Sequence, residues 1–282
     1  MPLIFEIGTV PVLPLEVQRL PWSSFPFPAA QDWSRLRVNS GSEQLPLGDF
    51  FRISGSAETD QTLHLIGDFS RVHGIGTGLN GGTILVEGNV GLEVGGKMSA
   101  GKIVVQGSAD DWAGMQMRGG TLRIQGNAGN SVGAAPPGAR RGMTRGRILV
   151  QGSAGRAVGA QLRRGLIAIG GNCGDGAGAG MIAGTLCLLG KAGRQIGLGM
   201  QRGTVLAPEL PPESVPQHFD FAARIDTVYL RLLQAELKTQ GLLAADHAFP
   251  TEFDCYRGDR LRSGLGELYL VPGRSSSQAV QT

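Results

Sequence analysis

The feature of this sequence that most constrains its fold is a 19-residue repeat. Seven consecutive units of this repeat cover residues 62–203. Five of them are 19 residues long, the unit at 62–82 has two extra residues, and the unit at 121–146 has seven extra around APPGARR. The seven consecutive units hold 37 of the 46 glycines, so the repeat accounts for a glycine content about twice the usual ~7%. Five units have the full regular length: TILVEGNVGLEVGGKMSAG from Thr83, KIVVQGSADDWAGMQMRGG from Lys102, RILVQGSAGRAVGAQLRRG from Arg147, LIAIGGNCGDGAGAGMIAG from Leu166 and TLCLLGKAGRQIGLGMQRG from Thr185.

Each unit begins with the pattern of a short strand and continues with regularly placed glycines. Unit positions 2 and 4 are apolar, as in Ile84 and Val86, which is the alternation of a strand with one buried face. Glycine recurs at positions 6, 13 and 19, and usually at 9, where a turning chain needs positive φ or a close backbone approach. A helix is a poor alternative, because each glycine inside it would cost about 1 kcal/mol.

Short strands joined by glycine corners at a fixed period indicate coils that stack at the strand spacing of about 4.8 Å. The sequence therefore predicts an all-β fold, a right-handed parallel β-helix of about seven 19-residue coils over residues 62–206. Other solenoids fit less well. The calcium-binding nonapeptide repeat needs a recurring Asp that is absent here, and the hexapeptide helix has a different period.

The flanking segments have a different composition. Residues 1–61 are rich in proline with short apolar stretches, and we expect an N-terminal cap and extended docking segment. Residues 207–272 are expected to form a C-terminal extension, with an amphipathic helix over 217–240 where apolar residues have helical spacing, followed by one or two strands. The last residues, 273–282, are polar and predicted to be disordered.

Composition bounds the cellular setting. No apolar run approaches the ~18 residues that span a membrane, and the first residues lack a basic segment followed by an apolar one, as a secretory signal would have. Three cysteines, Cys173, Cys187 and Cys255, form no C-x-x-C motif. We therefore expect a cytoplasmic protein that does not bind a membrane.

Charge is distributed unevenly along the chain. Residues 62–203 contain 15 Lys and Arg against 6 Asp and Glu, whereas the rest contains 11 and 17. Stacked coils would turn repeated arginines into ladders of like charge, which repel one another unless anions are present. A solvated face, or salt bridges to acidic subunits, would explain the same residues. The arginines fall at positions 17 and 18 (Arg118, Arg145, Arg163, Arg164, Arg202), in the insertion (Arg140, Arg141) and at position 10 (Arg71, Arg156, Arg194).

Catalytic, metal and nucleotide chemistry have little support. GIGTGLNG and GDGAGAG imitate glycine-rich loops, but no Gly-Lys-Ser/Thr and no helix follows them. Cys173 and Cys187 occupy unit positions 8 and 3, which are expected to face inward and outward, so they cannot converge on one metal. Nucleic acid would need aromatic stacking residues that the basic positions lack. We therefore expect no catalytic residue and no metal ligand in this chain, including its four histidines, His64, His73, His218 and His247.

The repeats GSADDWAGMQMRGG, GNAGNSVGAAPPGARRGMTRG and TLCLLGKAGRQIGLGMQRG lie between LPLGDFFRISG and YRGDRLRSGLGELYL. Together they closely resemble the C subunit of formylmethanofuran dehydrogenase, and most of all its bacterial version in the formyltransferase/hydrolase complex of methylotrophs. The resemblance extends from about residue 3 to residue 271. The C-terminal domain of the glutamate synthase large subunit shares the glycine-rich β-helix. The longer unit and the terminal Gly-Asp…Gly-x-Gly-Glu pattern favour the formyl-transferring family.

The resemblance implies a non-catalytic scaffold subunit of a complex that moves a formyl group from tetrahydromethanopterin to a methanofuran-type carrier and releases formate, in one-carbon (formaldehyde) oxidation. It implies zinc amidohydrolase-like, formyltransferase and accessory subunits as partners, with zinc only in a partner. The carrier, methanofuran or methylofuran, has a polyglutamate tail, and the hypothesis that follows is that the arginines hold this tail. Alternatives are the C subunit of an archaeal-type tungsten/molybdenum dehydrogenase, a glutamate-synthase-like domain, and a free-standing structural β-helix.

Overall fold

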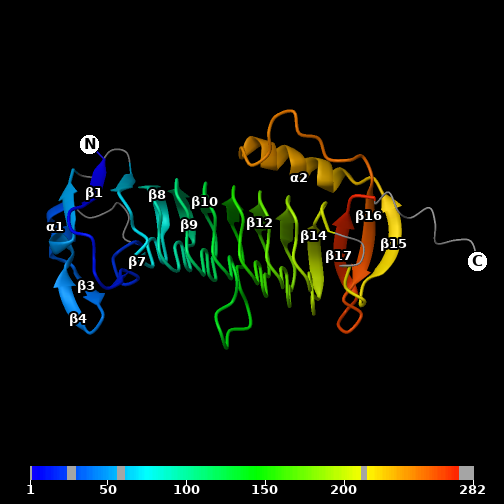
Figure 1. Cartoon of the computed structure of the whole chain (residues 1–282), viewed down its shortest axis with the longest axis horizontal. Coiled ribbons are helices and arrows are strands. Elements are labelled where there is room, and N and C mark those ends of the chain that lie inside the picture. Colours follow the sequence, from blue (N-terminus) through cyan, green and yellow to red (C-terminus); the bar gives the residue numbers. More distant parts are fainter. Residues whose placement is uncertain (1, 24–29, 56–60, 211–214, 273–282) are drawn as a thin grey trace, which may run out of the picture.

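A computed structural model of the chain describes residues 2–23, 30–55, 61–210 and 215–272. The predicted disordered tail, residues 273–282, lies outside the described residues. Among the described residues, thirteen strands form one long sheet, and its middle is a row of parallel strands (Figure 1). These strands are β6 (Thr62–Ile66), β8 (Asn80–Glu87), β9 (Ala100–Val105), β10 (Thr121–Ile124), β11 (Arg147–Val150), β12 (Leu166–Ile169), β13 (Thr185–Leu188) and β14 (Arg202–Leu206).

The parallel strands pair in the register of the repeat. Unit position 2 meets position 2 of the next unit, as in Ile84 with Ile103 and Ile103 with Leu122. A second line of contacts joins position 8 of successive units through parallel β-bridges, from Phe69 with Val90 to Cys173 with Ala192. Each unit is therefore hydrogen-bonded to its neighbours at two places. We call the stacked residues 62–206 the column.

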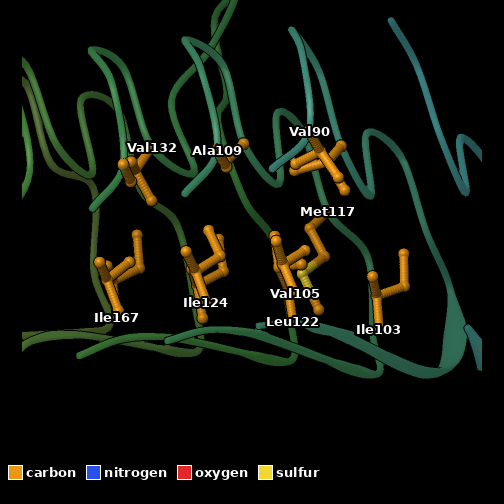
Figure 2. Packing of buried hydrophobic residues seen from close by; sticks show 14 of the residues in the cluster. Val90, Ile103, Val105, Ala109, Met117, Leu122, Ile124, Val132 and Ile167 are labelled. Carbon is orange, nitrogen blue, oxygen red and sulfur yellow. The ribbon is translucent and has the colours of Figure 1, made fainter. Parts of the chain in front are cut away.

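The core of the column is made by the apolar unit positions. Side chains at positions 2 and 4, such as Ile103 and Val105, are fully buried, and so is Met117 at position 16. Figure 2 shows such side chains from successive units pointing into the space enclosed by the chain. This packing confirms that positions 2 and 4 form the buried face of each strand.

The sheet is antiparallel at its ends, so as a whole it is mixed. At one end, β1 (Leu3–Ile7) pairs in parallel with β6 and antiparallel with β5 (Phe51–Ser54). At the other, β17 (Leu265–Leu270) pairs in parallel with β14, and β16 (Phe253–Gly258) and β15 (Asp220–Ile225) follow antiparallel. The chain is mostly β, in agreement with the predicted class, and the handedness of the column stays a prediction.

The N-terminal residues build a small second sheet. It contains β2 (Leu15–Glu16), β3 (Arg37–Ser40), β4 (Glu43–Pro46) and β7 (Val72–His73), with a short helix α1 (Ala30–Arg35) and a 3-10 turn η1 (Leu47–Asp49) beside it. Aromatic side chains fill the space between the two sheets: the rings of Phe5 and Trp33 lie 5.3 Å apart, and those of Trp22 and Trp33 lie 5.5 Å apart. The boundary at residue 61 stays a prediction.

The predicted helix over 217–240 is wrong in its first half. Only α2 (Val228–Thr239) is helical, and residues 220–225 form strand β15. β15 pairs antiparallel with β16, and Arg224 fixes the pair because its Nε lies 2.7 Å from Oδ1 of Asp254. Pairing at the end of a long sheet gives these backbone groups partners, and this outweighs the helical spacing of the apolar side chains.

Helix α2 lies along the outside of the column (Figure 1). It begins after Thr227, whose hydroxyl accepts a hydrogen bond from the Tyr229 backbone, and it buries Leu230, Leu233 and Leu237. These leucines pack on position 3 of the last four strands of the column, where the side chains are small or apolar. The covered residues are Leu149, Ala168, Cys187 and Leu206.

The terminal Gly-Asp motif joins the column to its C-terminal extension. The side chain of Asp259 is buried, and its carboxylate accepts hydrogen bonds from the backbone nitrogens of Gly199 (2.8 Å) and Leu261 (2.7 Å). Gly199 belongs to the last repeat unit and Leu261 to the turn between β16 and β17. The motif therefore has a structural role here, in which one carboxylate links two segments 60 residues apart.

Candidate functional site

Four of the predicted arginines meet in one shallow cleft on the column. They lie at unit positions 17 and 18 of three consecutive units, where the same backbone bond recurs: position 17 donates to the carbonyl of position 16 in the preceding unit. This bond joins Arg118 to Met98 (2.7 Å), Thr144 to Met117 (2.8 Å) and Arg163 to Met143 (2.9 Å). The cleft has a volume of about 260 Å³ and is lined by Arg118, Thr144, Arg145, Arg163 and Arg164.

The cleft has an unbalanced positive charge. Its lining contains no acidic side chain, and within the described residues none of the four guanidinium groups forms an ion pair or a side-chain hydrogen bond. Arg163 is half-buried and the other three are exposed. We call each repeat unit of the column a rung. Four like charges on neighbouring rungs repel one another, and a bound multivalent anion would offset this repulsion.

Arg202 does not join this cleft. It occupies position 18 two units further along, and the unit between carries Ile182 and Ala183 at positions 17 and 18. Ile182 makes the same backbone bond to Leu162 (2.7 Å) that the arginines make, so the stacking continues while the charge stops. The row of position 17 and 18 arginines is therefore interrupted.

The expectation that the position 10 arginines form a ladder of like charge is wrong. Between Arg156 and Arg194 stands Asp175, and Asp111 and Asn130 occupy the same position in earlier units. The acidic and amide side chains accept backbone hydrogen bonds from the next unit: Asn130 from Arg156, and Asp175 from Arg194, both at 2.8 Å. Position 10 thus mainly ties the units together.

The insertion projects from the column as a loop (Figure 1). Its base is held by the neighbouring units on both sides, because Ala135 donates to Ala160 (3.2 Å) and Gln116 Nε2 donates to the carbonyl of Arg141 (3.3 Å). Arg140 and Arg141 belong to this insertion and do not line the cleft. The structure therefore separates the predicted arginines into the cleft, the loop, position 10 and Arg202.

Sequence reasoning missed a polar ladder at unit position 7. The side-chain oxygen of each member accepts a hydrogen bond from the backbone nitrogen of position 7 in the next unit, at 2.8–3.0 Å. The sequence signal was the restriction of this position to Asn and Ser in five successive units. The accepting residues are Asn89, Ser108, Asn127, Ser153 and Asn172.

The described part of the chain contains neither a cluster of metal-ligating side chains nor a membrane-spanning helix. No group of three or more His, Cys, Asp or Glu side chains there could hold a metal ion. None of its helices is long and apolar enough to cross a membrane. A hollow of about 350 Å³ beside the N-terminal sheet mixes Glu16 and Glu93 with Arg19 and Arg37, so it lacks the single sign of charge that distinguishes the basic cleft.

The cysteines are buried in two different places. Cys173 fills position 8 in the core of the column, whereas Cys187 lies under α2 on the outer face of β13. Burial raises the pKa of the Cys173 thiol to about 12, and a hydrogen bond with the Gly174 backbone opposes this rise only in part. Burial raises the pKa of Cys187 as well. Neutral thiols are poor nucleophiles and poor metal ligands.

We expect the Cys173 thiol to make the column less stable at alkaline pH. The unfolded thiol ionises near pH ~8.5 and the folded one near pH 12, so between these values the folded state holds the extra proton. The free energy of unfolding should then fall as pH rises through this window, by at most about 1.4 kcal/mol per pH unit from this group.

The measurement is urea unfolding between about pH 8 and pH 10.5, and the matched variant is Cys173→Ala. Alanine already occupies position 8 in four other units, at Ala109, Ala128, Ala154 and Ala192, so it should fit. The variant should lose stability less steeply with pH than the natural chain. Identical slopes for the two proteins would show that Cys173 does not titrate on unfolding in this range.

Comparisons with known proteins give local matches to curated sequences and a match over nearly the whole chain to a solved structure. No family model matches the sequence. Over 60 residues it is 43% identical to the C subunit of molybdenum-containing formylmethanofuran dehydrogenase 1 from Methanothermobacter marburgensis, covering 21% of this chain and 15% of that protein. Over 88 residues it is 36% identical to the C subunit of tungsten-containing formylmethanofuran dehydrogenase 2 from the same organism, covering 30% and 33%. The chain thus spans a third or less of these relatives.

One of the matching solved structures covers nearly the whole chain. It is the X-ray crystal structure of the formyltransferase/hydrolase complex (FhcABCD) from Methylorubrum extorquens in complex with methylofuran. The TM-score is 0.82 and the sequence identity 28%, over 96% of this chain and 100% of that one. These comparisons confirm the resemblance that the repeats and the flanking motifs indicated.

Proposed function

We propose that this chain is the scaffold subunit of a formyltransferase/hydrolase complex, which transfers a formyl group from tetrahydromethanopterin to a methanofuran-type carrier and hydrolyses it to formate. The single observation that carries the proposal is the structural match at TM-score 0.82 over 96% of this chain and 100% of a chain of such a complex. A match over both whole chains supports an equivalent place in an equivalent assembly.

The column suits a scaffold. We infer that it is a right-handed parallel β-helix of about seven coils, flanked by an N-terminal cap and docking segment (1–61) and a C-terminal extension (207–272). Strand pairs, position 8 bridges and the position 7 ladder connect every coil to the next. Such a rod is stiff, so it can hold partner subunits at fixed separations. In this proposal the chain itself contributes no catalytic residue.

The basic cleft is the second element of the proposal. We infer that its arginines help to hold the polyglutamate tail of the carrier, because guanidinium groups bind carboxylates as bidentate forks. The solved complex contains methylofuran, which supports a carrier of this type. Exposed contacts of this kind are individually weak and are screened by salt, so they would retain a tail while its formyl-bearing head moves between active sites of partner subunits.

The partners in this proposal are a zinc amidohydrolase-like subunit, a formyltransferase subunit and accessory subunits, in the cytoplasm. One observation favours a second candidate. The local relatives are subunits of molybdenum- and tungsten-containing formylmethanofuran dehydrogenases, so a dehydrogenase complex is the alternative. In that case the partner chains would carry molybdopterin and iron–sulfur clusters instead of zinc.

The test begins with purification of the assembled complex through a tag on this chain from its native cells. Co-purification of a zinc amidohydrolase-like chain and a formyltransferase is the expected result. In that complex, replacing Arg118, Arg163 and Arg164 together by glutamine should raise the apparent KM for a long-tailed carrier about tenfold or more, at roughly 0.5–1 kcal/mol per exposed charge pair, and leave kcat unchanged.

Two controls accompany this experiment. A carrier analogue with a single glutamate should show little change in KM, because it cannot reach the cleft and the active site together. An equal rise in KM for short-tailed and long-tailed carriers would contradict binding of the tail by the cleft. Recovery of molybdopterin-containing subunits would favour the dehydrogenase complex over the formyltransferase/hydrolase complex.

A further inference from the structure

We propose that the basic cleft is a discrete site for a short run of about three carboxylates, and that the column has no continuous track for a polyanion. This inference rests on the proposed tail-holding function and limits it to one place. It also departs from the expectation that all the repeated arginines act together. The four arginines at positions 17 and 18 would hold one segment of a flexible oligocarboxylate, and the rest of that molecule would stay free.

The ends of the site are set by the units on either side. In the unit before Arg118, positions 17 and 18 are Ser99 and Ala100, and in the unit after Arg164 they are Ile182 and Ala183. Both neighbours are therefore uncharged at the positions that line the cleft. Ser99 is also engaged within the column, because its hydroxyl lies 3.0 Å from Oδ1 of Asn80. The positive charge thus occupies three rungs.

The size of the ligand follows from the spacing of those rungs. Three rungs lie about 4.8 Å apart, so the first and third are separated by about 10 Å. Each of the three carries at least one guanidinium group, and the middle one adds the Thr144 hydroxyl as a further donor. One carboxylate per rung satisfies the site. The ligand class is therefore a flexible oligomer with carboxylates at regular intervals, of which about three bind at once.

The environment of the cleft favours a carboxylate chain over a single small anion. The site is open, and three of its four arginines are exposed, so one monovalent anion would gain little in water. Several linked carboxylates gain more, because the first contact raises the effective concentration of the next. Length dependence is then the property that distinguishes a three-rung site from a track.

The test uses the purified full-length chain and γ-linked glutamate peptides of one to eight residues, titrated by calorimetry at several salt concentrations. The salt dependence of log Kd should steepen with each residue up to about three and then stay constant, because it counts the charge contacts that form. Arg118→Gln with Arg163→Gln should weaken the three-residue and the eight-residue peptide by the same factor, about tenfold, which corresponds to about 1.4 kcal/mol.

Matched variants lie on the same column outside the cleft. Lys97→Gln removes a positive charge at position 15 of the unit before Arg118, and Arg202→Gln removes one two units beyond Arg164. Neither change should alter the affinity for either peptide. A salt dependence that keeps steepening to eight residues, together with weaker binding of the long peptide by Arg202→Gln, would overturn the discrete site and leave tail holding intact. A folded chain that binds neither peptide would overturn both the discrete site and the holding of the tail. Thermal melts of each variant show whether its fold is unchanged.

Discussion

Replacing Gly88 by alanine should lower the free energy of unfolding by about 3 kcal/mol or more, which places it among the most damaging small substitutions. Gly88 occupies unit position 6 and does not have a positive φ. A Cβ atom there would lie 1.9 Å from the carbonyl oxygen of Gly67 in the preceding unit. The clash is with backbone, so no side chain can rotate away, and separating the units would stretch hydrogen bonds on both sides.

The control is Gly78→Ala, in the unit before that of Gly88, where backbone conformation and not a steric clash favours glycine. Its φ is +73°, but nothing lies within 4 Å of an added Cβ. Only backbone strain of about 1–2 kcal/mol is expected. Urea and thermal unfolding followed by circular dichroism measure both variants. Equal losses would mean that backbone conformation, and not the close approach of neighbouring units, requires glycine at position 6.

Replacing Leu237 by aspartate should detach α2 while leaving the column folded. Leu237 is fully buried among the side chains that α2 shares with the outer face of β11 to β14. An unpaired carboxylate there costs several kcal/mol, which exceeds what a 12-residue helix can offset alone in water. The expected result is exposure of Cys187, which lies beneath the helix and is inaccessible in the intact fold.

Thiol labelling followed by peptide mass spectrometry measures this effect residue by residue. In Leu237→Asp, Cys187 should react while Cys173, inside the column, stays protected. The control is Leu232→Asp on the same helix, because Leu232 is 64% exposed and its charge would meet water. Labelling of Cys173 at the same rate as Cys187 would show that the column unfolds with the helix, and that α2 is not a separate unit.

The strand pattern was predictable, and so was the stacking of arginines at positions 17 and 18 of successive units, because both depend on local repetition. Apolar residues at positions 2 and 4 form the buried face in every unit, and the stacking of equivalent positions brings Arg118 and Arg163 to one place without any knowledge of the flanks. The register follows from the period, because a shift by one residue would move every apolar side chain to the outer face.

The sequence failed where a residue's surroundings come from distant parts of the chain. Phe221 and Ile225 have helical spacing with Val228, yet pairing with β16 makes the first two part of a strand. The outward position 3 is apolar at Leu149 and Leu206, which α2 covers, but it is also apolar at Leu85 and Val104, which are only half-buried. The stretch of the column that the helix covers was therefore not predictable, because alternation within one strand does not reveal what lies on its outer face.

By itself, the sequence determined the period, the buried face and the positions where arginines repeat, since each of these is a property of one unit copied along the chain. Only the tertiary structure decided which groups surround each repeated position. It showed that four arginines of three consecutive units line one cleft, that position 10 side chains accept backbone hydrogen bonds from the next unit, and that α2 covers one stretch of the column. The physical reason is that charge and burial depend on neighbours in space, and stacking makes neighbours of residues from different units.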